Sequence, residues 1–207
     1  SGSRRVIKDR MGRVVEAGRE VTALRPGDRV FVRAGHGAGA VVPAAEAIPI
    51  PDPVSDAAAS WGALATITQT GVRRAEHTLG DTAAVVGLGP LGQLVVQYLR
   101  ALGLRRIIAI DTATSRLACA QAHGATDLFE GGAADALGLV ADRTGGQRAD
   151  VVYDMTGHWA VLPQALKLAR QFGKVVLIGD SPEPTKQHLT QDVLARQVTI
   201  LGSHGEK

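Results

Sequence analysis

The sequence predicts an α/β protein in which a doubly wound, six-stranded parallel sheet follows a smaller β region. From residue 80 onward, short apolar runs alternate with amphipathic stretches, which is typical of parallel strands joined by right-handed helical crossovers. A glycine turn of the form G-x-G-x-x-G joins the first of these strands to its helix. Earlier in the chain, Gly and Pro turns separate short β-type runs, as in a small β barrel. We therefore expect a partial β domain over 1–65 and a parallel-sheet domain over 66–207.

The β region is expected to contain three short strands, at 12–18, 29–32 and 41–42. Residues 25–28 read Arg-Pro-Gly-Asp, a combination that favours a tight reversal between the first two strands. Prolines at 43, 49, 51 and 53 exclude a helix from the segment that they punctuate. The connection into the second domain is therefore expected to be irregular.

One helix, over 54–72, is expected to lead into the parallel-sheet domain, with Ser55 or Asp56 capping its first turn. Its buried side is expected to consist of Trp61, Leu64 and Ile67. The expected strands of the sheet are 82–86, 106–111, 126–129, 150–154, 174–178 and 198–201. The expected helices between them are 91–102, 114–122, 133–143, 161–170 and 190–196.

The glycine turn consists of Gly87, Gly89, Pro90, Leu91 and Gly92. Its first glycine is expected to permit the tight turn, the second to let the backbone approach a diphosphate, and the third to let the helix pack closely on the strand. The helix would direct its free N–H groups and positive dipole end toward that diphosphate. Its buried face is expected to include Leu91, Leu94, Val95, Tyr98, Leu99 and Leu102.

The second strand of the sheet ends in an acid, Asp111, placed to accept hydrogen bonds from a ribose diol. Strand, glycine turn, helix, strand and acid thus occur in the order and spacing of a dinucleotide-binding site. The charge of Asp111 would repel a 2′-phosphate, so NAD is expected as the cofactor in preference to NADP. Thr112, which follows the acid, is included in the expected cofactor site.

Composition narrows the classes of partner. The net charge of the 207 residues is only +3, and 3% of them are aromatic. Nucleic-acid binding requires a concentrated basic face and stacking aromatics, and the sequence indicates neither. No apolar run approaches the length of a membrane span. The single cysteine, Cys119, excludes an internal disulfide and a cysteine-based zinc cluster, and a cytoplasmic location is the default expectation.

These motifs make the chain similar to the medium-chain dehydrogenase/reductase superfamily, which includes zinc alcohol dehydrogenases and zinc-free quinone and enoyl reductases. The resemblance extends from Gly12 to Ser203. It is carried by segments 12–18, 24–30, 41–44, 80–82, 87–92, 116–118 and 124–125. It implies a GroES-like catalytic domain beside a Rossmann cofactor domain, and hydride transfer between NAD(P)(H) and a small-molecule substrate.

The resemblance also adds residues to the expected cofactor site. Arg116 matches a basic position that contacts the adenosine ribose, although it could instead solvate a helix face. Thr66 matches a threonine beside the nicotinamide ring. The loops after the fourth, fifth and sixth strands of the sheet line the nicotinamide in the family, largely through backbone groups. Their residues here are Thr156, Gly157, Ile178, Gly179 and Ser203.

The chain departs from the zinc members of the superfamily at each ligand position. Lys8 stands where those members place a zinc-binding histidine, and Gly62 stands at the position of a cysteine or acid ligand. A short glycine-rich bridge over 33–40 replaces the four-cysteine structural zinc lobe. Because zinc needs three or four deprotonated ligands in fixed geometry, we expect neither a catalytic nor a structural zinc.

Two functions remain open from the sequence. The first is a zinc-independent, NAD-preferring oxidoreductase acting on a carbonyl/alcohol pair or on an enoyl or quinone substrate. The second is a truncated NAD(H)-binding module without turnover, because the family's first strands and returning C-terminal segment lie outside this sequence. No catalytic acid is assigned, and His36, His158 and Lys8 are titratable candidates. The apolar sixth strand, 198–201, is expected at the sheet edge, where it could pair with a second copy.

Overall fold

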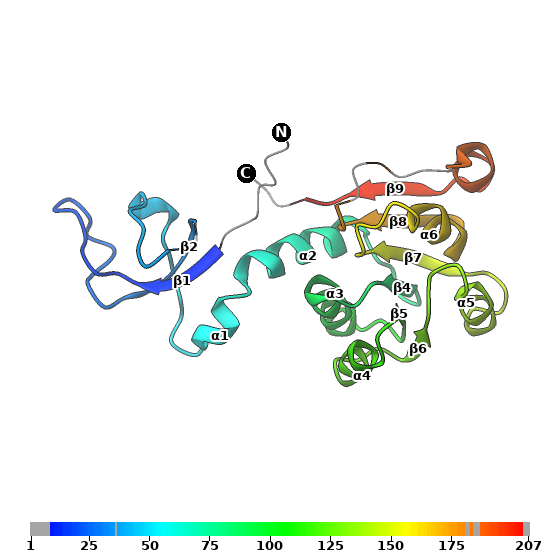
Figure 1. The fold of residues 1–207 in the computed structure, drawn as a ribbon, viewed down its shortest axis with the longest axis horizontal. Helices are drawn as coiled ribbons and strands as arrows, with labels where there is room; N and C mark the ends of the chain where they lie inside the picture. The colour runs from blue at the N-terminus through cyan, green and yellow to red at the C-terminus, as the bar shows by residue number, and fades with distance from the viewer. Residues whose placement is uncertain (1–8, 36, 181–182, 184–186, 205–207) are drawn as a thin grey trace. The chain divides into compact units, whose positions relative to one another are not determined.

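The computed structural model describes residues 9–35, 37–180, 183 and 187–204. The chain forms two compact units, Ser1–Leu64 and Ala65–Lys207, whose secondary structure is shown in Figure 1. Each unit is described by itself.

The first unit contains a three-stranded antiparallel sheet with the order β1-β2-β3. Its strands are β1 (Asp9–Arg13), β2 (Arg29–Arg33) and β3 (Ile48–Pro49). The expected strand at 41–42 is absent: Val41 is fully exposed, and the partner of β2 is Ile48–Pro49 instead. A proline at this position is tolerated because β3 lies at the sheet edge. A short 3₁₀ turn, Ala44–Glu46, precedes β3.

The expected single helix over 54–72 is two helices, α1 (Asp56–Ala59) and α2 (Gly62–Arg74). Ser55 caps α1, since its hydroxyl oxygen accepts a hydrogen bond from Ala58 N. The break follows at Ser60, whose hydroxyl donates to Ala57 O at 2.7 Å and so competes with helical backbone bonding. Trp61 lies at this break and is 42% exposed, so its expected burial is wrong.

The second unit is a six-stranded parallel sheet with helices between its strands, as predicted. Its strands are β4 (Thr82–Val86), β5 (Arg106–Asp111), β6 (Asp127–Glu130), β7 (Ala149–Asp154), β8 (Ala169–Leu177) and β9 (Thr199–Gly202). The spatial order is β6-β5-β4-β7-β8-β9. The chain therefore reverses its direction of winding between β4 and β7, which is where doubly wound sheets bind ligands, at the carboxyl ends of the strands.

Two separate cores cover the two faces of this sheet. Side chains alternate along a strand, so Ala83 and Val85 of β4 belong to one core and Ala84 and Val86 to the other. The first core also contains residues of α2, α3 (Pro90–Ala101) and α4 (Thr114–Ala122). The second contains residues of α5 (Leu137–Arg143) and α6 (Leu162–Leu168). A π-helical turn, Thr190–Leu194, precedes β9.

The ends of two expected helices differ from the structure. Leu102 is 59% exposed, because α3 ends at Ala101 and the chain reverses at Gly103, whose φ is +84°. Leu104 is the residue buried in its place. The helix expected over 161–170 ends at Leu168, and its last two expected residues begin β8.

Candidate cofactor site

The glycine turn follows β4 and leads into α3. Gly87 has a φ of +89°, a left-handed value that favours glycine, and a Cβ there would lie 2.8 Å from Thr156 Cγ2. A Cβ on Gly92 would overlap the carbonyl oxygen of Gly87. These two positions therefore exclude a side chain for reasons internal to the fold: one shapes the turn, and the other lets α3 approach the strand.

Gly89 differs from the other two glycines. Its φ is −63°, which any residue can adopt, and a Cβ at this position would meet no described atom within 4 Å. Nothing in the folded chain itself requires glycine here. Gly89 is the N-cap of α3 and Pro90 is its first residue, so open space adjoins the free N–H groups of the helix. The turn has the form of a cradle for an anionic group.

Asp111 lies at the carboxyl end of β5 and is 6% exposed. One carboxylate oxygen accepts from Leu88 N at 2.7 Å and the other from Ala113 N at 2.8 Å. Asp111 thus joins the glycine turn to the loop after β5. Each oxygen of an ionised carboxylate has two acceptor sites, so acceptor capacity remains for a ribose. Arg116 Nη1 lies 3.6 Å from Asp111 Oδ2, while Thr112 is exposed.

The loops after β7 and β8 contact each other. A Cβ on Gly157, whose φ is +63°, would lie 2.8 Å from Asp180 O, and a Cβ on Gly179 would overlap Gly157 N. Asp154 holds Thr156 in place. The backbone N–H and the hydroxyl of Thr156 both donate to Asp154 Oδ1. Burial raises the pKa of Asp154, although the hydrogen bonds from Thr156 oppose that shift.

Asp154 is a residue whose positioning role the sequence did not indicate. Its signal was available, because an acid two residues before a threonine at a strand end forms a common local turn.

The structure brings Ile178 and Ser203 together, but on the side of α2. A Cβ on Gly71 of α2 would collide with the side chain of Ile178 and approach Ser203 Oγ at 3.3 Å. Ser203 Oγ lies 3.4 Å from Ile67 O, and its backbone N donates to Leu177 O. Both side chains therefore pack against the helix. Thr66 lies on the exposed side of α2.

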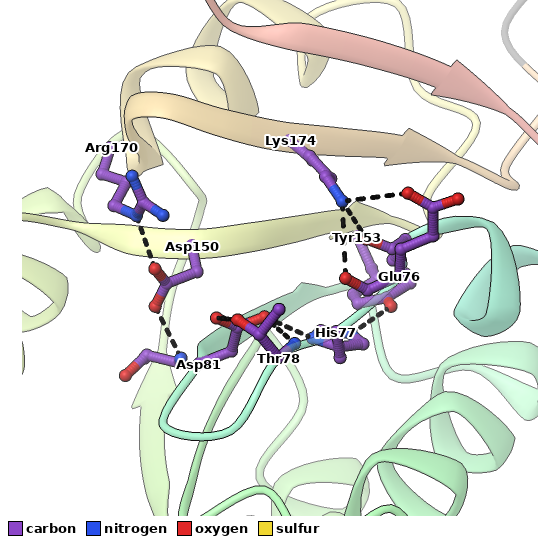
Figure 2. Close-up of polar contacts among 10 residues, drawn as sticks. Glu76, His77, Thr78, Asp81, Asp150, Tyr153, Arg170 and Lys174 are labelled. Carbon is purple, nitrogen blue, oxygen red and sulfur yellow. Dashed lines mark hydrogen bonds and ion pairs between the residues drawn. The ribbon is translucent and has the colours of Figure 1, made fainter.

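A second polar cluster ties the segment between α2 and β4 to strands β7 and β8 (Figure 2). His77 Nε2 lies 2.7 Å from the hydroxyl of Tyr153, and its Nδ1 lies 3.3 Å from Asp81 Oδ2. Asp150 accepts from Thr82 N and from Arg170 Nε, and Lys174 Nζ donates to Ala75 O. This cluster adjoins the amino end of β4, opposite the glycine turn.

Burial and hydrogen bonding together set the protonation states in this cluster. Burial lowers the pKa of His77 by more than the Asp81 carboxylate raises it. Burial would raise the pKa of Asp81, but hydrogen bonds from Thr78, together with the interaction with His77, hold that pKa below its usual value. At neutral pH, the contact between His77 and Asp81 is therefore a hydrogen bond from a neutral imidazole. Both ring nitrogens are engaged, and Tyr153 is fully buried, so we interpret the cluster as structural.

Replacing His77 with leucine is expected to flatten the pH dependence of stability in the range just below about pH 6.5. In the unfolded chain, His77 takes up a proton near its ordinary pKa of about 6.5, whereas its pKa in the fold is lower. The unfolded state therefore binds more protons in this range, so stability is complete above that range and falls as the pH drops. The slope for one proton approaches about 1.4 kcal/mol per pH unit.

Urea unfolding at several pH values measures this slope. His188 is exposed, and His188→Asn, which removes one titratable imidazole elsewhere, is the matched control expected to keep the wild-type slope. Equal slopes for wild type and His77→Leu would show that His77 does not resist protonation in the fold.

Among the described residues, no group of three or more His, Cys, Asp or Glu side chains is placed so that it could hold a metal ion. Gly62 stands at one ligand position of the zinc members. A Cβ at Gly62 would lie 3.2 Å from Cε2 of the Phe31 ring. Lys8 and His36 lie outside the described residues. His158 is exposed, with Nδ1 accepting from Ala160 N.

Within the described part of the chain, no helix has the length and apolarity to cross a membrane.

Comparisons with known proteins agree with this geometry. A family model described as zinc-binding dehydrogenase matches residues 90–207. The L-threonine 3-dehydrogenase of Bacillus velezensis is 35% identical over 136 residues, which are 66% of this chain and 39% of that protein. The (R,R)-butanediol dehydrogenase of Bacillus subtilis is 28% identical over 221 residues, covering 94% of this chain and 63% of that protein.

The fold is also shared with solved structures. The crystal structure of the alcohol dehydrogenase RspB from Escherichia coli CFT073, complexed with NADH, matches with a TM-score of 0.80 and 26% identity. The match covers 93% of this chain and 66% of that one. Across these three proteins, the chain spans 39% to 66% of their lengths. The chain belongs to the zinc-binding dehydrogenase family, within the medium-chain dehydrogenase/reductase superfamily.

Proposed function

We propose that the protein is a zinc-independent oxidoreductase that uses NAD(H) to transfer hydride to or from a small carbonyl/alcohol or enoyl/quinone substrate. The observation that carries this proposal is the link between Asp111 and the glycine turn. A carboxylate that could bind a ribose diol accepts a hydrogen bond from Leu88 N, inside the turn whose second glycine leaves open space for a diphosphate. Relatives that act as dehydrogenases support the same assignment.

In this proposal, each part of the cofactor is bound by a different group of residues. Residues 87–92 hold the diphosphate through backbone N–H groups, and Asp111, Thr112 and Arg116 hold the adenosine ribose. The backbone at Thr156, Gly157, Ile178, Gly179 and Ser203, with Thr66, lines the nicotinamide. When bound, the nicotinamide would donate or accept the hydride, and the chain would bind and orient the cofactor. The negative charge of Asp111 favours NAD, and the exposed Arg116 guanidinium offsets part of that charge.

Zinc independence is proposed from the residues at the ligand positions. A glycine has no side chain to bind metal, and Gly62 occupies one of these positions. Lys8, at another, would have to lose its proton to coordinate zinc. The family name describes its zinc members, and these residues do not fit the ion.

The alternative is a truncated NAD(H)-binding module without turnover of its own, which acts as a sensor or as a partner domain. The observation that favours it is the absence of a metal-binding side chain at Gly62, which leaves no assigned group to stabilise charge that develops on a substrate. Titration with NADH, followed by a turnover screen with alcohols, quinones and enoyl compounds, distinguishes the two functions. The enzyme hypothesis expects binding and turnover that survive prior treatment with a zinc chelator.

Each outcome has a distinct meaning. Turnover lost on chelation and restored by zinc would overturn zinc independence, and binding without turnover would support the module. A protein that binds neither NADH nor NADPH would overturn both hypotheses. NADPH binding tighter than NADH binding would overturn the proposed preference alone.

We also propose that two copies associate through β9. This strand lies at the edge of the described sheet, and Ile200 on it is 37% exposed. Unpaired N–H and C=O groups on an edge strand favour pairing with another chain. Sedimentation equilibrium tests the proposal, which a monomer at all concentrations would contradict.

A further inference from the structure

The side chain of Gln93, in the first turn of α3, connects three segments around the glycine turn. Its Nε2 donates to Leu88 O at 3.0 Å and to Arg116 O at 2.9 Å. Its Oε1 lies 3.2 Å from Nδ1 of His123, the residue that ends α4. The sequence indicates Gln93 only as a helix residue.

The partners of the amide determine its orientation. Two carbonyl oxygens can be satisfied only by the NH₂ group, so Nε2 must face Leu88 and Arg116. The oxygen then faces His123, whose Nδ1 must carry the hydrogen that it donates. Both Gln93 donors are therefore committed to backbone carbonyls of segments that flank the proposed cofactor site.

These bonds complete a closed circuit with Asp111. Leu88 is fixed at both ends, since its N–H donates to Asp111 and its C=O accepts from Gln93. Arg116 is held through its carbonyl by Gln93, and its guanidinium lies 3.6 Å from Asp111 Oδ2. The circuit runs from Gln93 through Leu88, Asp111 and Arg116 back to Gln93.

We propose that Gln93 is a positioning residue that pre-orders the adenosine half of the dinucleotide site. This inference rests on the proposed NAD(H) binding. Gln93 acts through Leu88 and Arg116, which it holds at the spacing that Asp111 sets. Binding to ordered loops avoids the entropy loss of ordering them on association, so Gln93 contributes affinity for any ligand that carries the adenosine diphosphate ribose moiety.

Gln93→Met tests this role, because methionine has a similar shape and helix propensity but no donor. Affinity for ADP-ribose and for NADH is expected to fall by the same factor, about tenfold, for two lost hydrogen bonds. The emission maximum of bound NADH is expected to stay unchanged, because the nicotinamide environment is untouched. Calorimetry and NADH fluorescence measure these quantities on the full chain.

Gln97→Met is the matched control. Gln97 lies one turn further along α3, and its side-chain amide donates to Gln93 O within the helix. It is expected to keep wild-type affinity. Gln93→Glu provides a second variant, since its carboxylate would face two carbonyl oxygens and should weaken ADP-ribose binding at least as much as Gln93→Met.

The outcomes distinguish the positioning role of Gln93 from the proposed NAD(H) binding. Wild-type binding of ADP-ribose with equal affinity in Gln93→Met and Gln97→Met would overturn the positioning role and leave the proposed function intact. A lowered melting temperature without a change in affinity would assign Gln93 a structural role only, which also overturns the proposal. If neither Gln93 variant folds, the residue is required for folding and the proposal is rejected. Failure of wild type to bind ADP-ribose would overturn both.

Discussion

Replacing Gly89 with alanine is expected to weaken NADH binding by about a hundredfold, or about 2.7 kcal/mol, while the melting temperature changes little. The added methyl group meets no described atom of the protein within 4 Å. It would instead occupy the space proposed for the diphosphate, where steric overlap costs about 1–3 kcal/mol. Alanine is a poorer N-cap than glycine but restricts the unfolded chain, and these opposing effects on stability are each below about 1 kcal/mol.

Gly92→Ala is the control that separates binding from folding. Its Cβ would overlap the carbonyl oxygen of Gly87, and backbone cannot rotate away as a side chain does. This variant is therefore expected to lose stability and binding together, whereas Gly89→Ala loses binding alone. Thermal unfolding and NADH titration of both variants measure the difference. Wild-type NADH affinity in Gly89→Ala would place the diphosphate elsewhere and remove the main support for the site.

The parallel sheet was predictable because its signals are local. The central strands β4, β5 and β7 are short apolar runs buried on both faces, and the glycine turn fixes the position of the first strand and its helix. The helix ends were less predictable, since capping and turn geometry decide them. Leu102 continues the apolar period of α3, yet the chain reverses at Gly103 and buries Leu104 instead.

Contacts between distant segments carry no local signal. His77 and Tyr153 are 76 positions apart, and no periodicity connects a loop residue to the fourth strand of the sheet. The same limit applies to Gln93 and Arg116, which are 23 positions apart. Sequence motifs identify the residues that face a cofactor, because its chemistry restricts them. The residues that hold those groups in place are restricted only by the tertiary structure.

In the proposed site, Asp111 both faces the cofactor and holds the glycine turn in place. Its replacement is therefore expected to have two separable effects. In Asp111→Ala, the N–H groups of Leu88 and Ala113 lose their acceptors, and each unsatisfied group costs about 1–3 kcal/mol. Because Leu88 is buried, water cannot fully replace the lost bond. Unfolding free energy should therefore fall by about 2–4 kcal/mol, and NADH affinity by about a hundredfold or more through the lost ribose contacts and loop order.

Asp111→Asn separates these effects, since it keeps the shape and one acceptor but removes the charge. Its ratio of NADPH to NADH dissociation constants should move toward one, because the repulsion of a 2′-phosphate disappears. Asp127→Asn is the control: that carboxylate, on β6, pairs with Arg143 at 2.5 Å, and its replacement is expected to leave the ratio unchanged. An unchanged ratio in Asp111→Asn would contradict ribose recognition by Asp111, while an unchanged unfolding free energy in Asp111→Ala would contradict its hold on the glycine turn. Because one measurement is a ligand ratio and the other needs no ligand, neither result can be mistaken for the other.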